Sequence, residues 1–430
     1  MNQFNIPINS LNMRNKLLNY TKQFDTFFFY DSNVDVNEEK SMAYQSYDML
    51  LALGINRELK FEAGKSFHQL EVFHKVNNTW LFGYLGYDLK NEIEDLTSSN
   101  EDFLALPNIQ FIEPQIVIAI HNDVMNVTST SLQIDAEKIA NDIIACDDFV
   151  SATLPKSQII ENTSQAHYIC AFKSLQEQIA YGNSYEINYC ISYNVIINHQ
   201  QWQTLYAELN NISKAPFSAL VKINNTVIIS ASPERFIKKT ADKLISQPIK
   251  GTRKRGNTPS EDQKQKEELF SDAKERSENV MITDLVRNDL SKHASRTSVE
   301  VEELFGIYSF KQVHQMISTV VANLNHQYNY IKAIKDAFPM GSMTGAPKIK
   351  AMQLIEKHEQ MKRGLYSGAL GYIDPNGDYD FNVLIRSLII DANTGKAQFC
   401  VGSAITASAN AEAEYHECLL KADALFKVLS

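Results

Sequence analysis

Lys250 is the first residue whose setting could support chemistry. It follows the step Pro248-Ile249 and precedes Gly251, and three cations follow at 253–255. Proline fixes its own backbone, and glycine lets another group approach closely. A lysine held in this way could act as a nucleophile, but lysines are mostly solvated surface cations. Taken alone, this stretch favours a surface cation. Whether Lys250 is a nucleophile therefore depends on the remaining motifs.

Two pairs of glutamates could form a cation site. Glu275 and Glu278 are three residues apart, and so are Glu414 and Glu417. On a helix this spacing places both carboxylates of a pair on one face. Two such helices facing each other would form an oxygen-only site for a hard cation such as magnesium, whereas a di-iron site would need Glu-x-x-His pairs. The alternative is that both pairs lie on ordinary solvated faces.

Four further features each leave two alternatives. The loop Gly341–Gly345 lacks the ending of a Walker phosphate loop, and it could hold an anion or form a structural turn. His314 lies in an apolar stretch, where a hydrogen-bonded core histidine is commoner than a catalyst. Arg386 lies inside the apolar strand NVLIRSLII, which predicts a buried anionic partner from the protein or from a ligand. Glu234 follows a predicted strand and could simply be a salt-bridged loop residue.

Composition narrows the class of protein. The 430 residues, 44% of them hydrophobic, could form two or three domains or one large composite unit. The formal net charge of −10 argues against a nucleic-acid partner. The five cysteines form no CxxC pair, which predicts free thiols in a reducing compartment. Since no signal peptide and no apolar run of ~20 residues is present, we expect a cytoplasmic protein with no membrane partner.

Hydrophobic alternation and turn residues predict antiparallel strands with helices inserted between them. We expect strands or hairpins at 24–32, 78–89, 108–130 (two strands around an Asn122-Asp123 turn), 181–197, 218–232, 242–252, 368–390 and 398–406. We expect helices at 163–180 with Ser164 as N-cap, from the capping box 258–261 through Asp284, and at 411–429. This pattern predicts an α+β layered fold rather than a parallel Rossmann sheet. The stretch 146–164 lacks periodicity and is the predicted internal boundary.

Eight stretches, taken together and in this order, resemble the chorismate-utilising enzymes, and most closely the large component of the aminodeoxychorismate synthases. They are SPERF (232–236), PIKGTR (248–253), KERSENVMITDLVRNDL (274–290), VHQMIST (313–319), FPMGSMTGAPKIKAM (338–352), RGLYSGALGYID (363–374), DFNVLIRS (380–387) and EYHECLLKA (414–422). The resemblance implies a composite sandwich of two antiparallel sheets flanked by helices. It implies a chorismate-binding catalytic region at 165–430 and an N-terminal region at 1–150, which resembles the family only through GYLGYDL (83–89) and FYDSN (29–33).

The resemblance also implies roles for individual residues. Magnesium would be held by Glu278 and Glu417, with Glu275 and Glu414 behind them. The substrate pocket would be formed by Tyr366 and Arg386 at the enolpyruvyl carboxylate, and by the Gly341–Gly345 loop with Ser342 and Thr344, Gly402 and Lys421. Glu234 would be the general acid for departure of the 4-hydroxyl group, and His314 an auxiliary acid–base or orienting group.

Lys250 separates the subfamilies of these enzymes. The aminodeoxychorismate synthases have PIKGT, as here, where anthranilate, isochorismate and salicylate synthases have PIAGT. The implied mechanism is attack of the lysine amine on ring C2, followed by attack of ammonia on C4. The amine must be neutral, and we expect burial and the cations at 253–255 to lower its pKa from ~10.4. The strand 184–188 contains no lysine to activate water, so isochorismate formation is not expected.

The sequence departs from the family pattern at a few positions. Glu186 stands where relatives usually have glutamine, Met340 replaces a common glycine, and Gly402-Ser403-Ala404 replaces a run of glycines. None of these changes removes a residue with an implied role.

The resemblance implies C4 amination of chorismate, on the way to 4-aminobenzoate and folate. Ammonia would come from a separate glutamine amidotransferase subunit, because no cysteine here has the setting of a glutaminase nucleophile. One alternative is an anthranilate synthase large component, which aminates C2, although Lys250 argues against it. Another is a non-catalytic chorismate-binding subunit. The region FYDSN could contribute to a tryptophan pocket, as the corresponding region does in some relatives.

Overall fold

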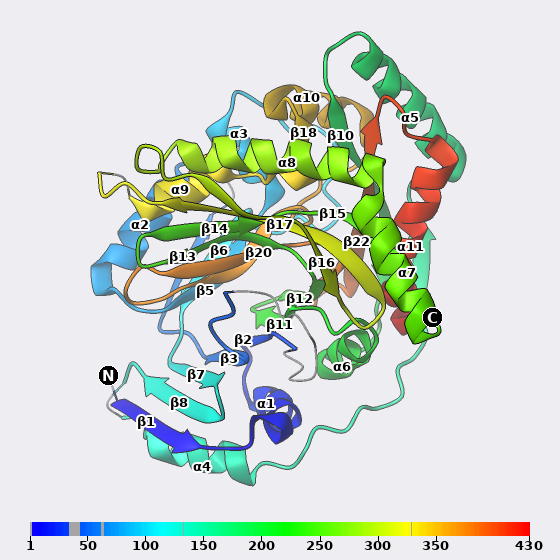
Figure 1. Cartoon of the computed structure of the whole chain (residues 1–430). Helices are drawn as coiled ribbons and strands as arrows, with labels where there is room; N and C mark the ends of the chain where they lie inside the picture. Colours follow the sequence, from blue (N-terminus) through cyan, green and yellow to red (C-terminus); the bar gives the residue numbers. More distant parts are fainter. Residues whose placement is uncertain (1, 34–43, 62–63, 132, 328) are drawn as a thin grey trace.

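Two large antiparallel sheets form the centre of the protein (Figure 1). The computed structural model describes residues 2–33, 44–61, 64–131, 133–327 and 329–430. Within these residues the first sheet contains, in spatial order, β1 (Asn2–Pro7), β8 (Val124–Ser129), β7 (Ile116–His121), β3 (Met49–Leu53), β2 (Phe27–Asp31), β11 (Phe217–Ile223), β12 (Thr226–Ser232), β21 (Ser387–Asp391), β22 (Lys396–Thr406), β10 (Glu186–Ile196) and β18 (Gly345–Ala346), with β9 (Gln158–Glu161) also paired to β10.

The second sheet has the same antiparallel pairing. Its described strands are, in spatial order, β15 (Ile249–Lys254), β17 (Val313–Asn323), β14 (Lys243–Gln247), β13 (Arg235–Thr240), β20 (Tyr379–Val383), β19 (Ala369–Ile373), β5 (Leu81–Leu85), β6 (Ile109–Glu113) and β4 (Arg57–Phe61), with β16 (Glu300–Ser309) also paired to β17. The predicted α+β sandwich of two antiparallel sheets is confirmed.

Three apolar layers hold the sandwich together. Between the sheets, Phe28 and Val221 of the first sheet join one buried cluster with Phe82 and Leu370 of the second. Helices cover the outer faces. The first sheet is covered by α1 (Met13–Tyr20), α4 (Ala136–Ala145), α5 (Gln165–Ala180), α6 (Trp202–Ser213), α10 (Lys348–His358) and α11 (Ala411–Leu429). The second is covered by α2 (Ser66–Asn77), α8 (Ala273–Ser291) and α9 (Tyr330–Ala337).

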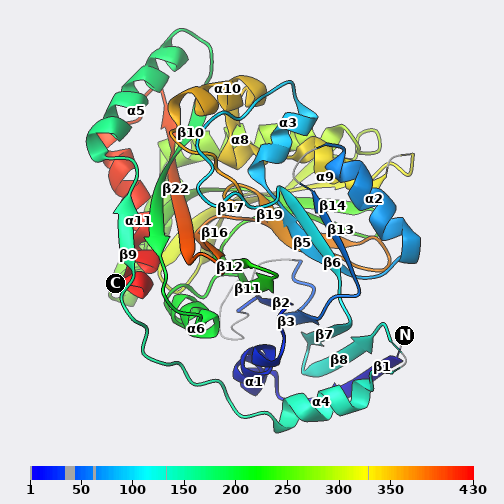
Figure 2. The same ribbon diagram turned by 180° about the vertical axis from the view of Figure 1, so that it is seen from behind.

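Strands from the two ends of the chain are interleaved in both sheets. β2 pairs with β11, and β5 pairs with β19. Seen from behind, the long strands β10 and β22 lie beside the closing helix α11 (Figure 2). The regions 1–150 and 165–430 therefore contribute to the same two sheets, and the division between them stays a prediction.

Several predicted elements are wrong in detail. The stretch 108–130 forms three strands, because Pro114 interrupts it and β6 lies in the other sheet from β7 and β8. Pro248 likewise divides 242–252 into β14 and β15, which pair with successive stretches of β17. The helix from 258 is two helices, α7 (Pro259–Ser271) and α8, because the carboxylate of Asp272 accepts from the N–H groups of residues 274 and 275 and starts a new helix.

Several local predictions are confirmed. The Ser164 side chain caps α5, and Thr258 with Glu261 forms the capping box of α7. Asn122 and Asp123 form the turn between β7 and β8, with φ of 50° and 59°.

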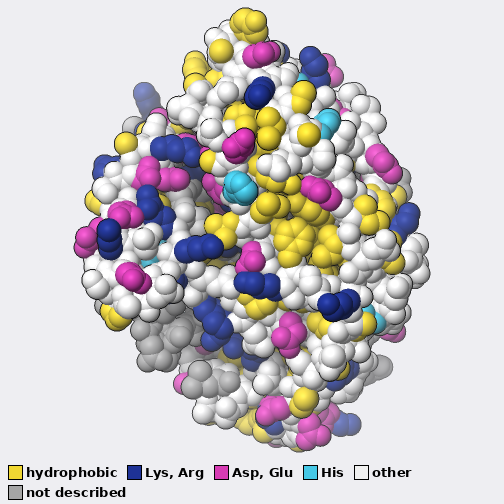
Figure 3. All heavy atoms as spheres, turned by 90° about the vertical axis from the view of Figure 1, so that its right-hand side faces the viewer, with side chains coloured by type: hydrophobic (Ala, Val, Ile, Leu, Met, Phe, Trp, Pro, Cys, Tyr) yellow, Lys and Arg dark blue, Asp and Glu magenta, His cyan; other side chains and the backbone are white. Residues whose placement is uncertain are grey.

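The surface view adds two observations. Hydrophobic side chains gather near the middle of the face shown, among interspersed side chains of both charges (Figure 3). Among the described residues, no helix is long and apolar enough to cross a membrane.

Candidate functional site

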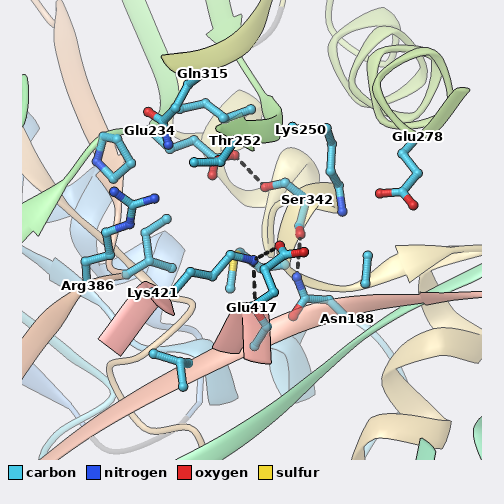
Figure 4. A pocket seen from close by; sticks show the side chains of 18 of the residues that line it. Asn188, Glu234, Lys250, Thr252, Glu278, Gln315, Ser342, Arg386, Glu417 and Lys421 are labelled. Carbon is cyan, nitrogen blue, oxygen red and sulfur yellow. Dashed lines mark hydrogen bonds and ion pairs between the residues drawn. The ribbon is translucent and has the colours of Figure 1, made fainter. Parts of the chain in front are cut away.

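One cavity collects most of the predicted site residues. It is lined by β10, β15, β17, α8, α11, β22 and the loops before β13 and β21. The predicted residues on its walls are Glu234, Lys250, Glu275, Glu278, Ser342, Tyr366, Arg386, Gly402, Glu414, Glu417 and Lys421. Figure 4 shows Glu278 and Lys250 toward one end of this cavity and Arg386 at the other.

Lys250 projects from β15 into the cavity. Gly251 has φ +89°, and a Cβ there would lie 3.1 Å from a carboxylate oxygen of Glu275. Glycine therefore allows β15 to approach α8, as the sequence pattern indicated. Nζ of Lys250 forms an ion pair of 2.5 Å with Oε1 of Glu186, and the two side chains are 10% and 1% exposed.

The pKa of Lys250 departs from expectation. Burial lowers this pKa, but the carboxylates of Glu186 and Glu278 outweigh burial and raise it above its ordinary value. The expectation that the following cations lower the pKa is wrong, because these two carboxylates dominate and because Arg253 and Arg255 are paired elsewhere. Arg253 forms ion pairs with carboxylates of α7 and the α7–α8 junction, and Arg255 forms one with Asp262. The resting site therefore holds the ammonium form of the lysine.

The predicted metal ligands lie on two helices that face one cavity. Burial raises the pKa of Glu278 to about 7, against the opposing effect of Lys250. Oε1 of Glu278 is buried without a hydrogen bond and lies 3.7 Å from Nζ of Lys274. Lys274 forms a closer ion pair of 2.9 Å with Glu414. Glu278 therefore has unused capacity to bind a cation.

These carboxylates fit magnesium by their chemistry. Within the described residues, no group of three or more His, Cys, Asp or Glu side chains is placed to hold a metal ion. Lysines form ion pairs with three of the four carboxylates: Glu278 and Glu414 as above, and Glu417 at 2.8 Å from Lys421. The oxygen-only donor set, with Oε1 of Glu278 accepting no hydrogen bond, still suits a hard divalent cation. Binding would require those lysines to move or to share their partners.

Arg386 marks the other end of the cavity. It lies not inside a strand, as predicted, but at the break between β20 and β21, with φ +50°. Its guanidinium group has no hydrogen bond or ion pair with any other described residue. Burial lowers its pKa, and the charges of Glu234 and Glu417 oppose this effect without outweighing it. A half-buried cation without a protein partner suits a ligand carboxylate, which was one of the two predicted alternatives.

Glu234 is placed as a candidate acid. The Oγ of Ser342 donates to its Oε1 at 2.6 Å, and the carbonyl oxygen of Ser342 accepts from Nδ2 of Asn188 at 2.9 Å (Figure 4). Burial raises the pKa of Glu234 to about 7. A large fraction of this carboxyl group is therefore protonated at neutral pH.

Gly402 and Lys421 close the floor. Nζ of Lys421 donates to the carbonyl oxygen of Gly402 at 2.9 Å. A Cβ at position 402 would lie 2.7 Å from Oδ1 of Asn188, so a larger residue would displace the neighbouring strand. Tyr366 also lines the cavity, and its hydroxyl oxygen is 3.7 Å from Sγ of Cys190.

Two predicted residues do not face the cavity. The Thr344 hydroxyl donates back to the carbonyl oxygen of Met340 at 3.2 Å. His314 bonds through its ring nitrogens to Ser309 and Asp262, each at 2.9 Å. His314 does not line the cavity, because side chains alternate along β17. The next residue, Gln315, lines the cavity in its place, and its Oε1 is buried without a hydrogen bond.

Four residues at or beside the cavity were not predicted to act there: Asn188, Glu186, Lys274 and Gln315. Asn188 lies on the same strand face as Glu186, because side chains alternate along a strand. Lys274 lies on the same helix face as Glu278, because the two are four residues apart. Glu186 was noted in the sequence only as a departure from the family pattern.

Known proteins match both the sequence and the fold. The profile of the chorismate binding enzyme family matches residues 21–427. Aminodeoxychorismate synthase component 1 of Escherichia coli (strain K12) is 34% identical over 358 residues, covering 81% of this chain and 76% of that protein. Probable aminodeoxychorismate synthase, chloroplastic, of Oryza sativa subsp. japonica is 32% identical, covering 81% of this chain but only 43% of that longer protein.

A solved structure supports the fold alone. Anthranilate synthase component I from Streptococcus pneumoniae TIGR4 has a TM-score of 0.78 and 22% identity, covering 91% of this chain and 95% of that chain. The shared architecture, the match over nearly the whole chain and the sequence identity to curated relatives agree. The chain belongs to the family of chorismate binding enzymes.

Proposed function

We propose that this protein aminates chorismate at C4 with ammonia, giving 4-amino-4-deoxychorismate through a covalent adduct on Lys250. One observation carries the proposal: a buried primary amine, that of Lys250, and the carboxyl group of Glu234 line the same cavity. A buried lysine in a ligand-sized cavity has the chemistry of a nucleophile. The names of the E. coli and rice relatives support the same reaction.

The two ends of the cavity suit the two carboxylates of chorismate. Arg386, which has no anionic partner among the described residues, would hold the enolpyruvyl carboxylate together with the hydroxyl group of Tyr366. Magnesium held by Glu278 and Glu417, with Glu275 and Glu414 behind them, would neutralise and orient the ring carboxylate. Ser342, Gly402 and Lys421 would form the floor.

The reaction would then proceed in two displacements. The neutral amine of Lys250 attacks C2 of the ring, and Glu234 gives its proton to the departing 4-hydroxyl group. Ammonia attacks C4 and expels the lysine from C2. The designation "component 1" of the bacterial relatives implies a second component, and a glutamine amidotransferase would supply the ammonia. The product would lead to 4-aminobenzoate and folate.

Product identification tests this function. The purified chain is incubated with chorismate, magnesium and an ammonium salt, and the products are separated by chromatography. We expect an intermediate that becomes 4-aminobenzoate only after aminodeoxychorismate lyase is added. Anthranilate formed without lyase would show C2 amination instead, and chorismate binding without any product would indicate a non-catalytic subunit.

A matched pair of variants tests the covalent step. Lys250→Ala should lower the rate on the order of 10³-fold, because direct amination lacks the first displacement. Lys254→Ala removes an exposed lysine from the same strand and should leave the rate unchanged. Wild-type protein incubated with chorismate but no ammonia should gain the mass of chorismate less one water, and Lys250→Ala should not. An unchanged rate in Lys250→Ala would contradict the adduct.

A further inference from the structure

Glu186 is a buried carboxylate to which neither the metal site nor the substrate carboxylates assign a role. It lies on β10 with its side chain 1% exposed, on the same strand face as Asn188. Its Oε1 pairs with Nζ of Lys250 at 2.5 Å. Its Oε2 is buried and has no hydrogen-bond partner. Buried polar atoms are normally hydrogen-bonded, so an unused oxygen on a buried carboxylate requires an explanation.

The ion pair cannot react as it stands. An ammonium group has no lone pair, so Lys250 must lose a proton before it can attack a ring carbon. Although burial lowers its pKa, Glu186 and Glu278 together raise that pKa above the ordinary value. The contact that positions the amine therefore also keeps it protonated. Some group near Nζ must accept that proton.

The other charged groups around Lys250 are less suited to that task. They are Lys274, Glu275 and Glu278 of α8, Glu417 and Lys421 of α11, and Glu234 before β13. The lysines are already cations. The glutamates of α8 and α11 are the proposed metal ligands, and Glu234 must keep its own proton for the leaving hydroxyl group. Within the described part of the chain, Glu186 is the carboxylate in ion-pair contact with Nζ.

We propose that Glu186 takes the proton of Lys250 when chorismate is bound and returns it when the lysine is released. This inference rests on the proposed covalent role of Lys250. Transfer converts the ammonium–carboxylate pair into an amine and a carboxylic acid, with no change in total charge. The amine lone pair then forms the N–C2 bond as the C4–O bond breaks, and the hydroxyl group leaves as water with the proton of Glu234.

The second displacement and the proton transfers that follow it return Lys250, Glu186 and Glu234 to their starting protonation states. Ammonia forms the C4–N bond as the C2–N bond breaks, and the electrons of that bond return to Lys250 as a free amine. The new C4 ammonium group gives its extra proton to Glu234. Glu186 then returns its stored proton to Lys250. The sum is chorismate plus ammonia giving the amino product plus water.

Glu186→Gln tests the proposal through a pH profile. Glutamine keeps the size and a hydrogen-bond acceptor but cannot take up a proton. The proton of Lys250 must then pass to solvent, so the reactive fraction of the amine depends on pH. We expect the ratio of kcat, variant to wild type, to be below ~0.1 near neutral pH and to rise about tenfold per pH unit. The ratio cancels the shared effects of Glu234 and of ammonia protonation.

Two further variants control this result. Glu186→Asp keeps a proton acceptor, so its ratio should be lowered but independent of pH. Glu177→Gln makes the same chemical change on the exposed side of α5, and its ratio should stay near one. A ratio for Glu186→Gln that does not change with pH overturns the inference. If the glutamine variant does not fold, a pH-dependent ratio for Glu186→Asp overturns it equally.

Product analysis separates this inference from the proposed function. Wild-type protein that forms no 4-amino-4-deoxychorismate would remove both. If the wild-type protein forms this product but the kcat ratio for Glu186→Gln does not change with pH, the proposed role of Glu186 is contradicted. The proposed function is then unaffected.

Discussion

Two buried ion pairs contact the same strand, β10, and they differ in how completely they are satisfied. Arg363 and Glu359, with side chains 1% and 2% exposed, form two hydrogen bonds with each other. Arg363 also donates to the carbonyl oxygens of Met343 and Asn188 and to Oγ of Ser367. This pair thus ties the wall of the cavity to the loops behind it.

The pair formed by Lys250 and Glu186 is the opposite case. One carboxylate oxygen has no partner, and the pair lies at a cavity rather than behind its wall. Glu278 Oε1 and Gln315 Oε1, close to the same cavity, are also buried without hydrogen bonds. Buried polar groups are normally paired, so unpaired groups gathered at one cavity indicate a place prepared for a ligand. A satisfied pair stabilises the fold, and an unsatisfied pair is available for chemistry.

The largest expected effect is the loss of stability when the Arg363–Glu359 pair is broken. Arg363→Met removes one partner and leaves the carboxylate of Glu359 buried alone, which should lower the free energy of unfolding by about 3–5 kcal/mol. Denaturant unfolding of the purified protein measures this change. Lys362→Met, one residue away and partly exposed, should stay within about 0.5 kcal/mol of wild type. Equal stability of the two variants would contradict a stabilising role for the Arg363–Glu359 pair.

The next effect is on the pH dependence of the reaction. Glu234 must be protonated to act as an acid, and burial raises its pKa to about 7. The protonated form is present below this pKa, so kcat/KM, which reports the groups of the free protein, should fall as pH rises through about 7. Glu234→Gln should lower kcat roughly 10²-fold and remove this limb of the profile.

Steady-state rates at a series of pH values measure both effects. Glu137→Gln in the first turn of α4 makes the same substitution at an exposed position and should retain the wild-type profile. A limb that persists unchanged in Glu234→Gln would assign the titration to another group, with Glu278 the first candidate.

A smaller effect is expected at the unpaired arginine. Arg386→Gln removes the charge that would hold a substrate carboxylate, and a hydrogen bond to a charged group is worth about 1.5–3 kcal/mol. The KM for chorismate should rise roughly 10–100-fold. Because this contact is made in the ground state and the transition state alike, kcat should change much less. Arg287→Gln on the exposed side of α8 is the matched control, and an unchanged KM in Arg386→Gln would contradict a carboxylate site there.

Much of the fold and most of the cavity could be predicted from the sequence. Caps and turns are local, so the start of α5, the capping box of α7 and the Asn122-Asp123 turn followed from residue type. The breaks at Pro114 and Pro248 were missed because each joins two apolar runs that look continuous. Which sheet a strand enters depends on distant partners, and local periodicity does not contain that information.

The candidate site, like the fold, could be predicted from the sequence only in part. The motifs predicted that Lys250, Glu234 and Arg386 belong to one site, and all three line one cavity. A motif identifies such residues by their type and their position in the sequence. The state of Lys250 could not be predicted, since its pKa depends on Glu186, a residue 64 positions away in the sequence. The ion pairs of Arg253 and Arg255 with residues of α7 and its C-terminal end could not be predicted either, and the direction of the shift is set by Glu186 and Glu278.

The smallest expected effect comes from two neighbours on β17. His314→Ala loses hydrogen bonds to Ser309 and Asp262, which should cost about 1–2 kcal/mol of unfolding free energy and leave kcat/KM within about twofold of wild type. Gln315→Leu replaces a side chain whose buried Oε1 has no partner. It should therefore cost little stability but raise the KM for chorismate by about 2–10-fold, if that oxygen accepts from the substrate. Thermal unfolding and steady-state kinetics on both variants measure the contrast. The reverse pattern, with activity lost at 314 and stability lost at 315, would return His314 to the site and show that the strand presents its other face to chorismate.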